Sequence, residues 1–223
     1  MIQMLNREKQ IEKGVTDNQE KQALTYHEIK RGIDVIVALL AIVLFAPVFL
    51  VTALAIYIED GAPVFFIQER NGLHGKIFRM YKFRSMCRDA AKIHQSLLAQ
   101  NELDGPAFKM KDDPRLTRVG KFIRKTSIDE LPQLLNILKG EMSIVGPRPL
   151  PTYETAELNE YQRQRMNVKP GLTCYWQCSG RNDIPFGEWM EMDMKYIEDE
   201  SICTDARIMV KTVASVITGK GAC

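Results

Sequence analysis

Paired cysteines, a large net charge and a fixed-period repeat are all missing from this sequence of 223 residues. The five cysteines are odd in number and none forms a Cys-x-x-Cys pair, which argues against a disulfide framework and favours a reduced, cytoplasmic setting. A zinc site that joined Cys174 and Cys178 to His74 or His94 would match no known ligand spacing, so packed or free thiols are favoured. The net charge of +2 gives no general reason to expect nucleic acid as a partner.

One long hydrophobic run is present, from Ile33 to Ile58, and Asp34 is its only charged residue. As a helix, this run of about 26 residues would be roughly 39 Å long, which is enough to cross a hydrocarbon core of about 30 Å. Pro47 would kink such a helix in its middle. Basic residues flank both ends of the run, and basic flanks favour the cytoplasmic side. The residues alone therefore leave a spanning helix and a re-entrant helix equally open.

The stretch that precedes the hydrophobic run is of a different kind. From Met1 to Tyr26 it is polar, mixed in charge and poor in apolar periodicity. It is not a signal peptide, because the apolar run begins too late and no small-residue cleavage site follows it. We therefore expect residues 1–29 to form a polar, loosely ordered extension.

Two basic segments follow the hydrophobic run. Stretches rich in aromatic and β-branched residues flank Asn71-Gly72 and predict a β-hairpin. Its second arm is either a solvated face beside acidic lipid or a surface that binds phosphate. The second segment follows Pro114, and its basic residues have near-helical spacing. It contains no zinc-finger, RNA-recognition or helix-turn-helix signature. Phosphorylated small substrates or lipid head groups therefore fit this segment better than nucleic acid. The basic residues are Lys76, Arg79, Lys82 and Arg84 in the hairpin, and Arg115, Arg118, Lys121, Arg124 and Lys125 in the second segment.

The segment "DELPQLLNILKGEMSIVGPRP" places an acidic pair, Asp129 and Glu130, before a leucine-rich helical pattern. Ser127 and Glu130 have capping-box spacing, and Asp129 would favour the positive end of the helix dipole, so a purely structural role explains both acids. The alternative is phosphoryl transfer. One carboxylate would attack phosphorus, its neighbour would hold Mg²⁺, and Arg148 between two prolines would neutralise phosphate charge.

Three motifs in this order, "KFRSM", "DPRLTRVGKFIRKTSIDELPQLLNILKGEMSIVGPRP" and "VKPGLTCYWQCSGRN", resemble the bacterial sugar transferase family, the monotopic polyprenyl-phosphate phosphoglycosyl transferases. The resemblance covers about Lys30 to Val216. It implies an α+β fold with a re-entrant membrane helix over residues 30–58, a small β-hairpin, and a helix-rich catalytic domain over residues 59–223 at the membrane interface. It also implies a location at the cytoplasmic face of the bacterial inner membrane.

The resemblance implies transfer of a sugar 1-phosphate from a UDP-sugar to polyprenyl (undecaprenyl) phosphate, with release of UMP and a covalent intermediate. Such a reaction starts the assembly of exopolysaccharide, capsule or O-antigen glycans. Mg²⁺ is the implied cofactor, and membrane phospholipid is a further partner. Nucleic acid is not expected, a homodimer is left open, and the sequence leans toward a hexose donor without identifying the sugar.

Site residues follow from the same resemblance. Asp129 would be the nucleophile and Glu130 would help to bind the metal. Asp193 is a weaker candidate, since an exposed helix face would explain it equally well. The remaining expected residues are Lys82, Arg84, Arg124 and Arg148 at the phosphates, Arg181 in the nucleotide-sugar pocket, and the membrane anchor residues Lys30 and Arg31, at the level of the lipid head groups, and Pro47.

The sequence departs from the family pattern at two positions. Ala46 precedes Pro47 where the family has serine, so a hydroxyl that would bond the broken backbone is missing. Cys174 stands where glycine is common, which is expected to alter a loop near the sugar pocket. Two alternatives to the implied reaction stay open: a non-catalytic, membrane-anchored basic module that binds anionic lipid or a partner, and a direct displacement without a covalent adduct.

Overall fold

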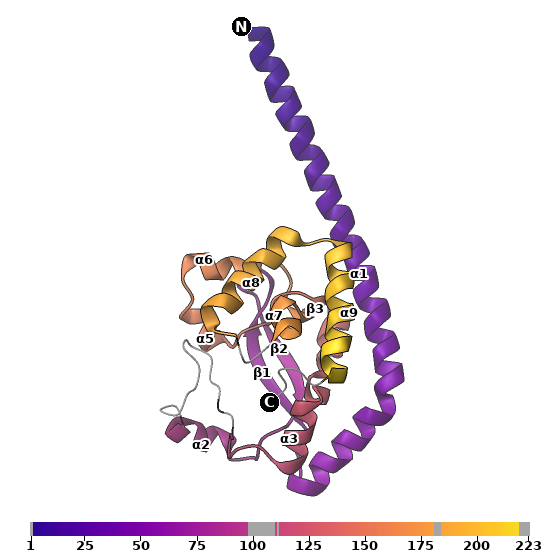
Figure 1. The fold of residues 1–223 in the computed structure, drawn as a ribbon, viewed down its shortest axis with the longest axis vertical. Coiled ribbons are helices and arrows are strands. Elements are labelled where there is room, and N and C mark those ends of the chain that lie inside the picture. Colours follow the sequence, from indigo (N-terminus) through magenta and orange to yellow (C-terminus); the bar gives the residue numbers. More distant parts are fainter. Residues whose placement is uncertain (1, 98–109, 111, 181–183, 219–223) are drawn as a thin grey trace.

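The computed structural model describes residues 2–97, 110, 112–180 and 184–218. A long N-terminal helix lies along a domain of short helices and small sheets, which confirms the predicted α+β class (Figure 1). The described helices and strands are α1 (Ile2–Asp60), β1 (Phe65–Asn71), β2 (Ile77–Phe83), α2 (Ala90–Leu97), α3 (Arg118–Lys125), α4 (Gln133–Lys139), β3 (Ser143–Val145), α5 (Thr152–Ala156), α6 (Glu160–Arg163), β4 (Gly171–Thr173), α7 (Tyr175–Ser179), α8 (Phe186–Asp199) and α9 (Ile202–Thr218).

Helix α1 is continuous from Ile2 to Asp60, so residues 2–29 are helical where the sequence predicted a loosely ordered extension. Glutamate, lysine and glutamine are frequent in this part and have good helix propensity, and a helix that continues from a hydrophobic segment avoids the cost of a new nucleus. The stretch Leu24–Asp60 is long and apolar enough to cross a membrane. Its outward side chains include Val43, which is 75% exposed, so this face has no covering within the described chain.

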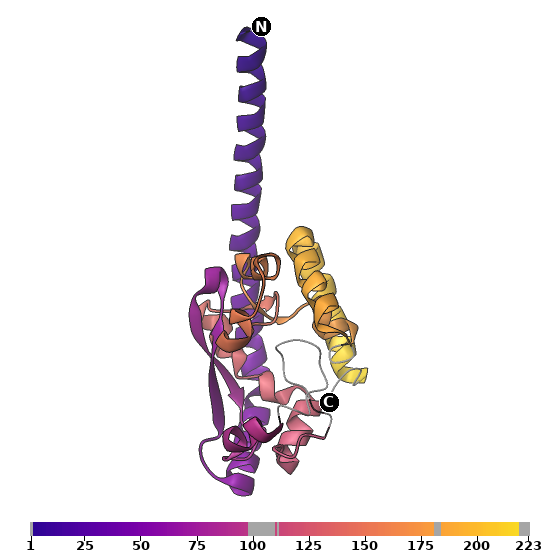
Figure 2. The ribbon, with the colours of Figure 1, turned by 90° about the vertical axis from the view of Figure 1, so that its left-hand side faces the viewer.

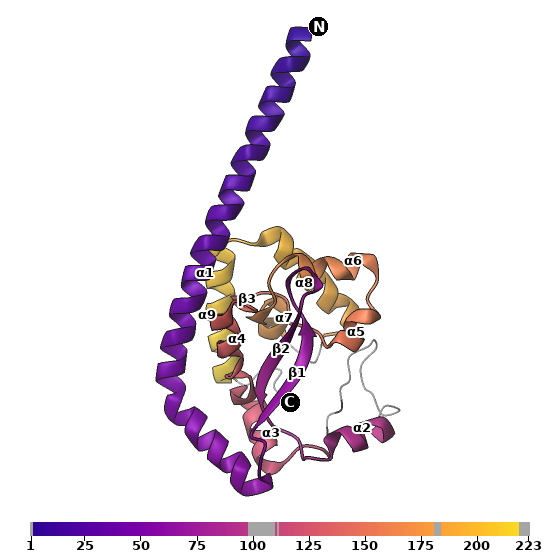
Figure 3. The ribbon, with the colours of Figure 1, turned by 180° about the vertical axis from the view of Figure 1, so that it is seen from behind.

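Helix α1 bends around the domain, and its C-terminal part turns toward α3 (Figures 1 and 3). Pro47 lies inside the helix, where it removes a backbone hydrogen bond and displaces the preceding turn, a common cause of kinks. Before the proline, Ala38 packs into the main core. After it, Phe49 and Ile56 pack against Phe83 of β2. Pro47 therefore lies between two separate contacts of the continuous helix α1 with one domain.

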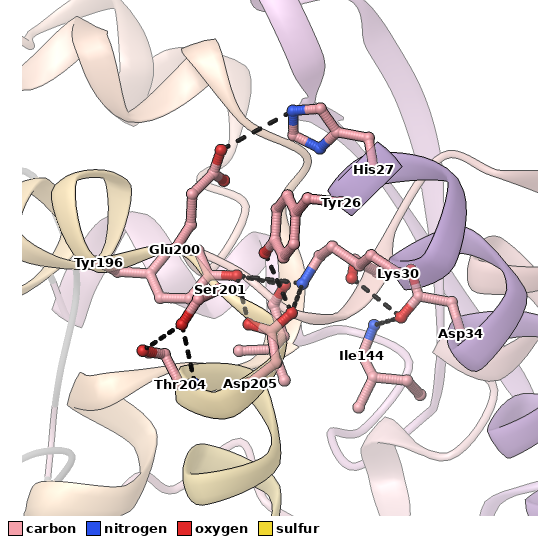
Figure 4. Close-up of polar contacts among 12 residues, drawn as sticks. Tyr26, His27, Lys30, Asp34, Ile144, Tyr196, Glu200, Ser201, Thr204 and Asp205 are labelled. Carbon is pink, nitrogen blue, oxygen red and sulfur yellow. Dashed lines mark hydrogen bonds and ion pairs between the residues drawn. The ribbon is translucent and has the colours of Figure 1, made fainter. Parts of the chain in front are cut away.

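A polar cluster joins α1 to the C-terminal helices (Figure 4). Asp205 of α9 forms an ion pair with Lys30. The same carboxylate accepts hydrogen bonds from the hydroxyls of Tyr26, at 3.1 Å, and Tyr196, at 2.8 Å. Lys30 also donates to the Tyr196 hydroxyl over 3.1 Å. Lys30 was predicted to lie among lipid head groups, but its ammonium is directed into the protein, where it docks α1 on α8 and α9.

Two further residues of α1 bind backbone groups of the domain. The Arg31 guanidinium donates to the carbonyls of Ile137, at 2.6 Å, and Leu138, at 2.8 Å, at the C-terminal end of α4. Such a cation is favoured at the negative end of a helix dipole. Asp34 is buried and accepts hydrogen bonds from the backbone N–H of Ile144, at 2.8 Å, and the Ser143 hydroxyl, at 3.0 Å. The single charge in the hydrophobic run thus has a structural partner on β3.

We expect Asp205→Asn to lower the free energy of unfolding by about 3 kcal/mol, because it leaves Lys30 without its counter-charge in a largely buried setting. For a chain of this size, the midpoint of thermal unfolding in detergent would fall by roughly 6 °C or more. Asp199→Asn, which changes an exposed carboxylate at the end of α8, is the matched control. An Asp205→Asn protein as stable as the control would mean that Lys30 does not stabilise the contact of α1 with α9 and has a role only at the membrane surface.

The C-terminal end of α1 is fixed to the same domain. The Glu59 carboxylate accepts hydrogen bonds from the first backbone N–H groups of α3, those of Arg118 at 2.7 Å and Val119 at 3.0 Å. Arg84, just after β2, donates to the carbonyls of Asp60, at 3.1 Å, and Gly61, at 2.8 Å. Both ends of the apolar run therefore contact one domain.

The domain is built around a predicted hairpin. Strands β1 and β2 pair antiparallel from Phe65 opposite Phe83 to Asn71 opposite Ile77, which confirms the hairpin around Asn71-Gly72. Strands β3 and β4 form a short parallel pair. Figure 2 shows the hairpin and the α8–α9 pair on opposite sides of the domain. Between them lies the main core, made of Ala38, Phe78, Met80, Leu134, Ile137, Met142, Ile144, Val145, Cys174, Tyr196 and Ile208.

Cys174, which stands where glycine is common in the family, packs in the main core without backbone strain. Its backbone is extended, with φ of −159°, a conformation that any residue adopts. Its side chain is fully buried in the main core. The cysteine therefore adds packing contacts to the main core, and its effect on the sugar pocket stays a prediction.

Candidate active site

The acidic pair lies on a single turn of 3-10 helix, Ile128–Glu130, between α3 and α4. Ser127 enters the turn in the left-handed conformation, with φ of 57°, and its side chain makes no capping hydrogen bond. Helix α4 begins only at Gln133, after Pro132. The predicted capping box is therefore wrong, and Glu130 is directed toward other partners.

Two cations from distant parts of the chain bind Glu130. Lys82 of β2 donates to its Oε1 atom over 2.9 Å, and Arg148 contacts the same oxygen over 2.8 Å. Burial alone would raise the pKa of Glu130, but Arg148 and Lys82 outweigh burial and hold this pKa well below its ordinary range. Glu130 is therefore ionised at neutral pH, at the centre of a cationic site.

Asp129 is 6% exposed, and its pKa is shifted in the opposite direction to that of Glu130. Burial raises the pKa of its carboxyl group, and the charge of Glu130 raises it further, while Lys82, Arg124 and Arg148 oppose the shift. A carboxylate held this way is more basic than usual and remains surrounded by cations. This combination suits attack on an anionic phosphorus centre.

Arg148 is positioned by the turn that follows β3 and by the tryptophans of α7 and α8. Its guanidinium lies 5.8 Å from the ring centre of Trp176, within the range of a cation–π contact. Trp176 stacks on Trp189, with ring centres 4.4 Å apart. Arg148 is thus held between an aromatic face and the carboxylate of Glu130.

The remaining predicted phosphate residues lie at different places. Arg124 is exposed on α3, close enough for its charge to lower the pKa of Asp129. Arg84 is buried against the end of α1, where it donates to the carbonyls of Asp60 and Gly61 and forms an ion pair with Asp60. Arg181 lies outside the described residues.

Asp193 is fully buried, so the exposed-face interpretation of this residue is wrong. It forms an ion pair with Arg165 over 2.6 Å. Burial raises the pKa of Asp193 to about 6, and Arg165 opposes this shift. Sequence reasoning missed Arg165. The signal for Asp193 was present, because Trp189, Met190, Asp193 and Tyr196 recur at helical spacing and are all buried.

No group of three His, Cys, Asp or Glu residues that would hold a metal ion occurs among the described residues, and the zinc interpretation gains no support there. Magnesium has a different requirement, because it binds through one or two carboxylates together with substrate phosphates and water. Neighbouring Asp129 and Glu130 meet that requirement in number and chemistry.

The sequence of this chain is similar to those of known proteins. The family model described as "Bacterial sugar transferase" matches residues 25–219. The galactosyl transferase CpsE of Streptococcus agalactiae is 46% identical over 196 residues, covering 86% of this chain and 43% of that protein. The undecaprenyl-phosphate galactose phosphotransferase of Salmonella typhimurium is 38% identical over 203 residues, covering 87% and 41%.

The exopolysaccharide production protein ExoY of Sinorhizobium fredii is 38% identical over 196 residues, covering 86% of this chain and 87% of that protein. The chain thus spans less than half the length of the first two relatives and most of the third. Because the family model matches most of the sequence, the chain belongs to the bacterial sugar transferase family.

Proposed function

We propose that this chain transfers a sugar 1-phosphate from a UDP-sugar to polyprenyl phosphate and releases UMP. The observation that supports this most strongly is the buried Asp129 beside Glu130, whose carboxylate binds Lys82 and Arg148. The names of two similar proteins, a galactosyl transferase and an undecaprenyl-phosphate galactose phosphotransferase, support the same reaction class and a hexose donor.

In the proposed reaction, a carboxylate oxygen of Asp129 attacks the β-phosphorus of the UDP-sugar. The bond from that phosphorus to the oxygen bridging it to the α-phosphate breaks, and UMP leaves with the electron pair. A phosphate oxygen of the polyprenyl phosphate then attacks the same phosphorus and displaces Asp129, giving a polyprenyl diphosphate sugar. Lys82 and Arg148 neutralise charge on the phosphoryl oxygens during both steps.

Glu130, together with substrate phosphate oxygens, would hold Mg²⁺. The ion would supply charge neutralisation at the diphosphate. The low pKa of Glu130 keeps its carboxylate available as a ligand over the whole neutral range. Lys82 and Arg148 fix the orientation of this carboxylate.

The proposed location is the cytoplasmic face of the bacterial inner membrane, with α1 re-entrant among the phospholipids. Both ends of its apolar run contact one domain, through Lys30 at one end and Glu59 at the other. A helix that crossed the bilayer would separate these ends. The site would then meet a lipid-linked phosphate at the surface and a soluble UDP-sugar, as the first step of exopolysaccharide, capsule or O-antigen assembly requires.

We expect purified protein in detergent, with Mg²⁺ and undecaprenyl phosphate, to release UMP from UDP-galactose or UDP-glucose. Omitting Mg²⁺ or adding a chelator should abolish release. UDP-N-acetylgalactosamine in the same assay tests whether an acetamido sugar is accepted. A folded protein that binds lipid vesicles in a salt-sensitive way, but turns over none of these donors, would instead support a non-catalytic basic module.

The turnover number should fall in acid. Asp129 must be ionised to attack, and burial raises its pKa above the ordinary value of 3.8. The rate of UMP release should therefore fall by about tenfold per pH unit below that raised pKa. A profile of turnover number against pH, checked for stability at each pH, measures this limb. A rate that stayed constant down to pH 3.8 would contradict the role of Asp129.

A further inference from the structure

The turn that carries Arg148 can be held mainly through its carbonyl groups. Pro147 and Pro149 have no backbone N–H, so neither residue can donate a hydrogen bond. Buried carbonyls nevertheless need donors. The orientation of this turn therefore depends on the groups that donate to its oxygens.

Each of the four carbonyls from Pro147 to Leu150 accepts a hydrogen bond from a different donor. The backbone N–H of Gly171 donates to Pro147, at 2.9 Å, and that of Asn71 donates to Leu150, at 3.2 Å. The two central carbonyls receive charged donors. Arg165 donates to the carbonyl of Arg148 over 2.7 Å, and Arg70 donates to that of Pro149 over 2.9 Å.

Arg165 is the more tightly fixed of these two cations. Its side chain is 4% exposed, and its Nε and Nη2 atoms donate to one oxygen of Asp193 over 3.0 and 2.6 Å. The guanidinium also lies 5.5 Å from the ring centre of Trp189. Because it is anchored to α8 on two sides, it can transmit the position of that helix to the Arg148 carbonyl.

Arg165 and Arg148 are also connected through their side chains. Arg165 lies against Trp189, Trp189 stacks on Trp176, and Trp176 contacts the Arg148 guanidinium. Arg165 is thus connected to Arg148 in two ways, by a hydrogen bond to its backbone carbonyl and by the two tryptophans that contact its side chain. A hydrogen bond from a charged donor is worth about 1.5–3 kcal/mol, more than one from a neutral group.

We propose that Arg165, held by Asp193, is a positioning residue that fixes Arg148 against Glu130. The expected loss of turnover in variants of Arg165 rests on the proposed function. The expected loosening of the Pro-Arg-Pro turn does not. Loss of the Arg165–Asp193 pair removes no group that contacts substrate, but it frees the Pro-Arg-Pro turn and so displaces Arg148. A displacement of about 1 Å at such a site lowers turnover by up to about 100-fold.

The test variant is Arg165→Met combined with Asp193→Leu. Removing both charges together avoids leaving a buried charge unpaired, so the protein is expected to fold. Arg163→Met is the matched control, because Arg163 lies two residues away and also donates to carbonyls, those of Leu158 and Ala156, outside the turn. We expect the double variant to lose 10- to 100-fold in kcat (~1.4–2.7 kcal/mol) with a smaller change in KM, and the control to lose less than about twofold.

Two further readouts separate positioning from general stability. In combination with Arg148→Met, the double variant should add no further loss of turnover, since Arg165 acts through Arg148. Losses that multiply would overturn the proposal. Hydrogen exchange of the backbone amides in residues 144–150 should be faster in the double variant than in the control. This result is expected even if the wild type releases no UMP. Unchanged exchange in these residues would also overturn the proposal. A wild type without UMP release would refute only the proposed function.

Discussion

Asp129→Asn is expected to lower the turnover number for UMP release by at least about 10³-fold, because the amide cannot form the proposed acyl phosphate. The fold should survive the change. Burial raises the pKa of Asp129, so the native state binds its proton more tightly than the unfolded state does, and this group's contribution to stability decreases as pH rises above 3.8. At neutral pH the neutral side chain should therefore cost little or no stability.

Asp89→Asn is the matched control, since it makes the same change at an exposed carboxylate on the approach to α2. Turnover by the control should equal that of the wild type, and thermal unfolding of both variants should occur near the wild-type midpoint. An Asp129→Asn protein that retained most of its turnover would leave the acidic pair with only a structural role.

Glu130→Gln is expected to lower both turnover, by about 100-fold or more, and the free energy of unfolding, by about 2 kcal/mol. The amide leaves Lys82 and Arg148 without their shared counter-charge. Because these cations hold the pKa of Glu130 below its usual value of 4.5, the wild-type stability advantage should be complete above that pH and disappear as pH falls well below it. Chemical denaturation at several pH values measures this difference.

Glu188→Gln changes an exposed carboxylate on α8 and serves as the control for that series. Its free energy of unfolding should follow the wild type at each pH, within about 0.5 kcal/mol. A Glu130→Gln protein whose stability matched the wild type at neutral pH would contradict the ion pairs with Lys82 and Arg148.

Local patterns predicted the elements that carry the site. The Asn71-Gly72 turn between two β-rich stretches identified the hairpin, and the leucine spacing before Gly140 identified α4. The sequence left two interpretations of Glu130 open, a helix cap and a catalytic residue, because its spacing from Ser127 fits a capping box. Only the tertiary arrangement, which brings Lys82 and Arg148 to its carboxylate, distinguishes the two interpretations.

Residues whose partners lie far along the chain could not be predicted in this way. Arg165 and Asp193 are 28 residues apart, and although helical spacing indicates the buried face that carries Asp193, no local pattern identifies Arg165 as its partner. The family resemblance placed Lys30 at the level of the lipid head groups, yet its partner Asp205 is 175 residues away. Sequence patterns describe faces and turns, whereas the pairing of distant charges depends on how those faces pack.

The most direct test of the proposed chemistry is mass spectrometry of the protein after incubation with UDP-galactose and Mg²⁺ in the absence of polyprenyl phosphate. Digestion with trypsin isolates residues 126–139, which contain Asp129. We predict that this peptide gains the mass of one hexose phosphate, that UMP appears in equal amount, and that added polyprenyl phosphate removes the adduct. UMP release that occurs only with the lipid acceptor, and without an adduct at any stage, would contradict the covalent role of Asp129.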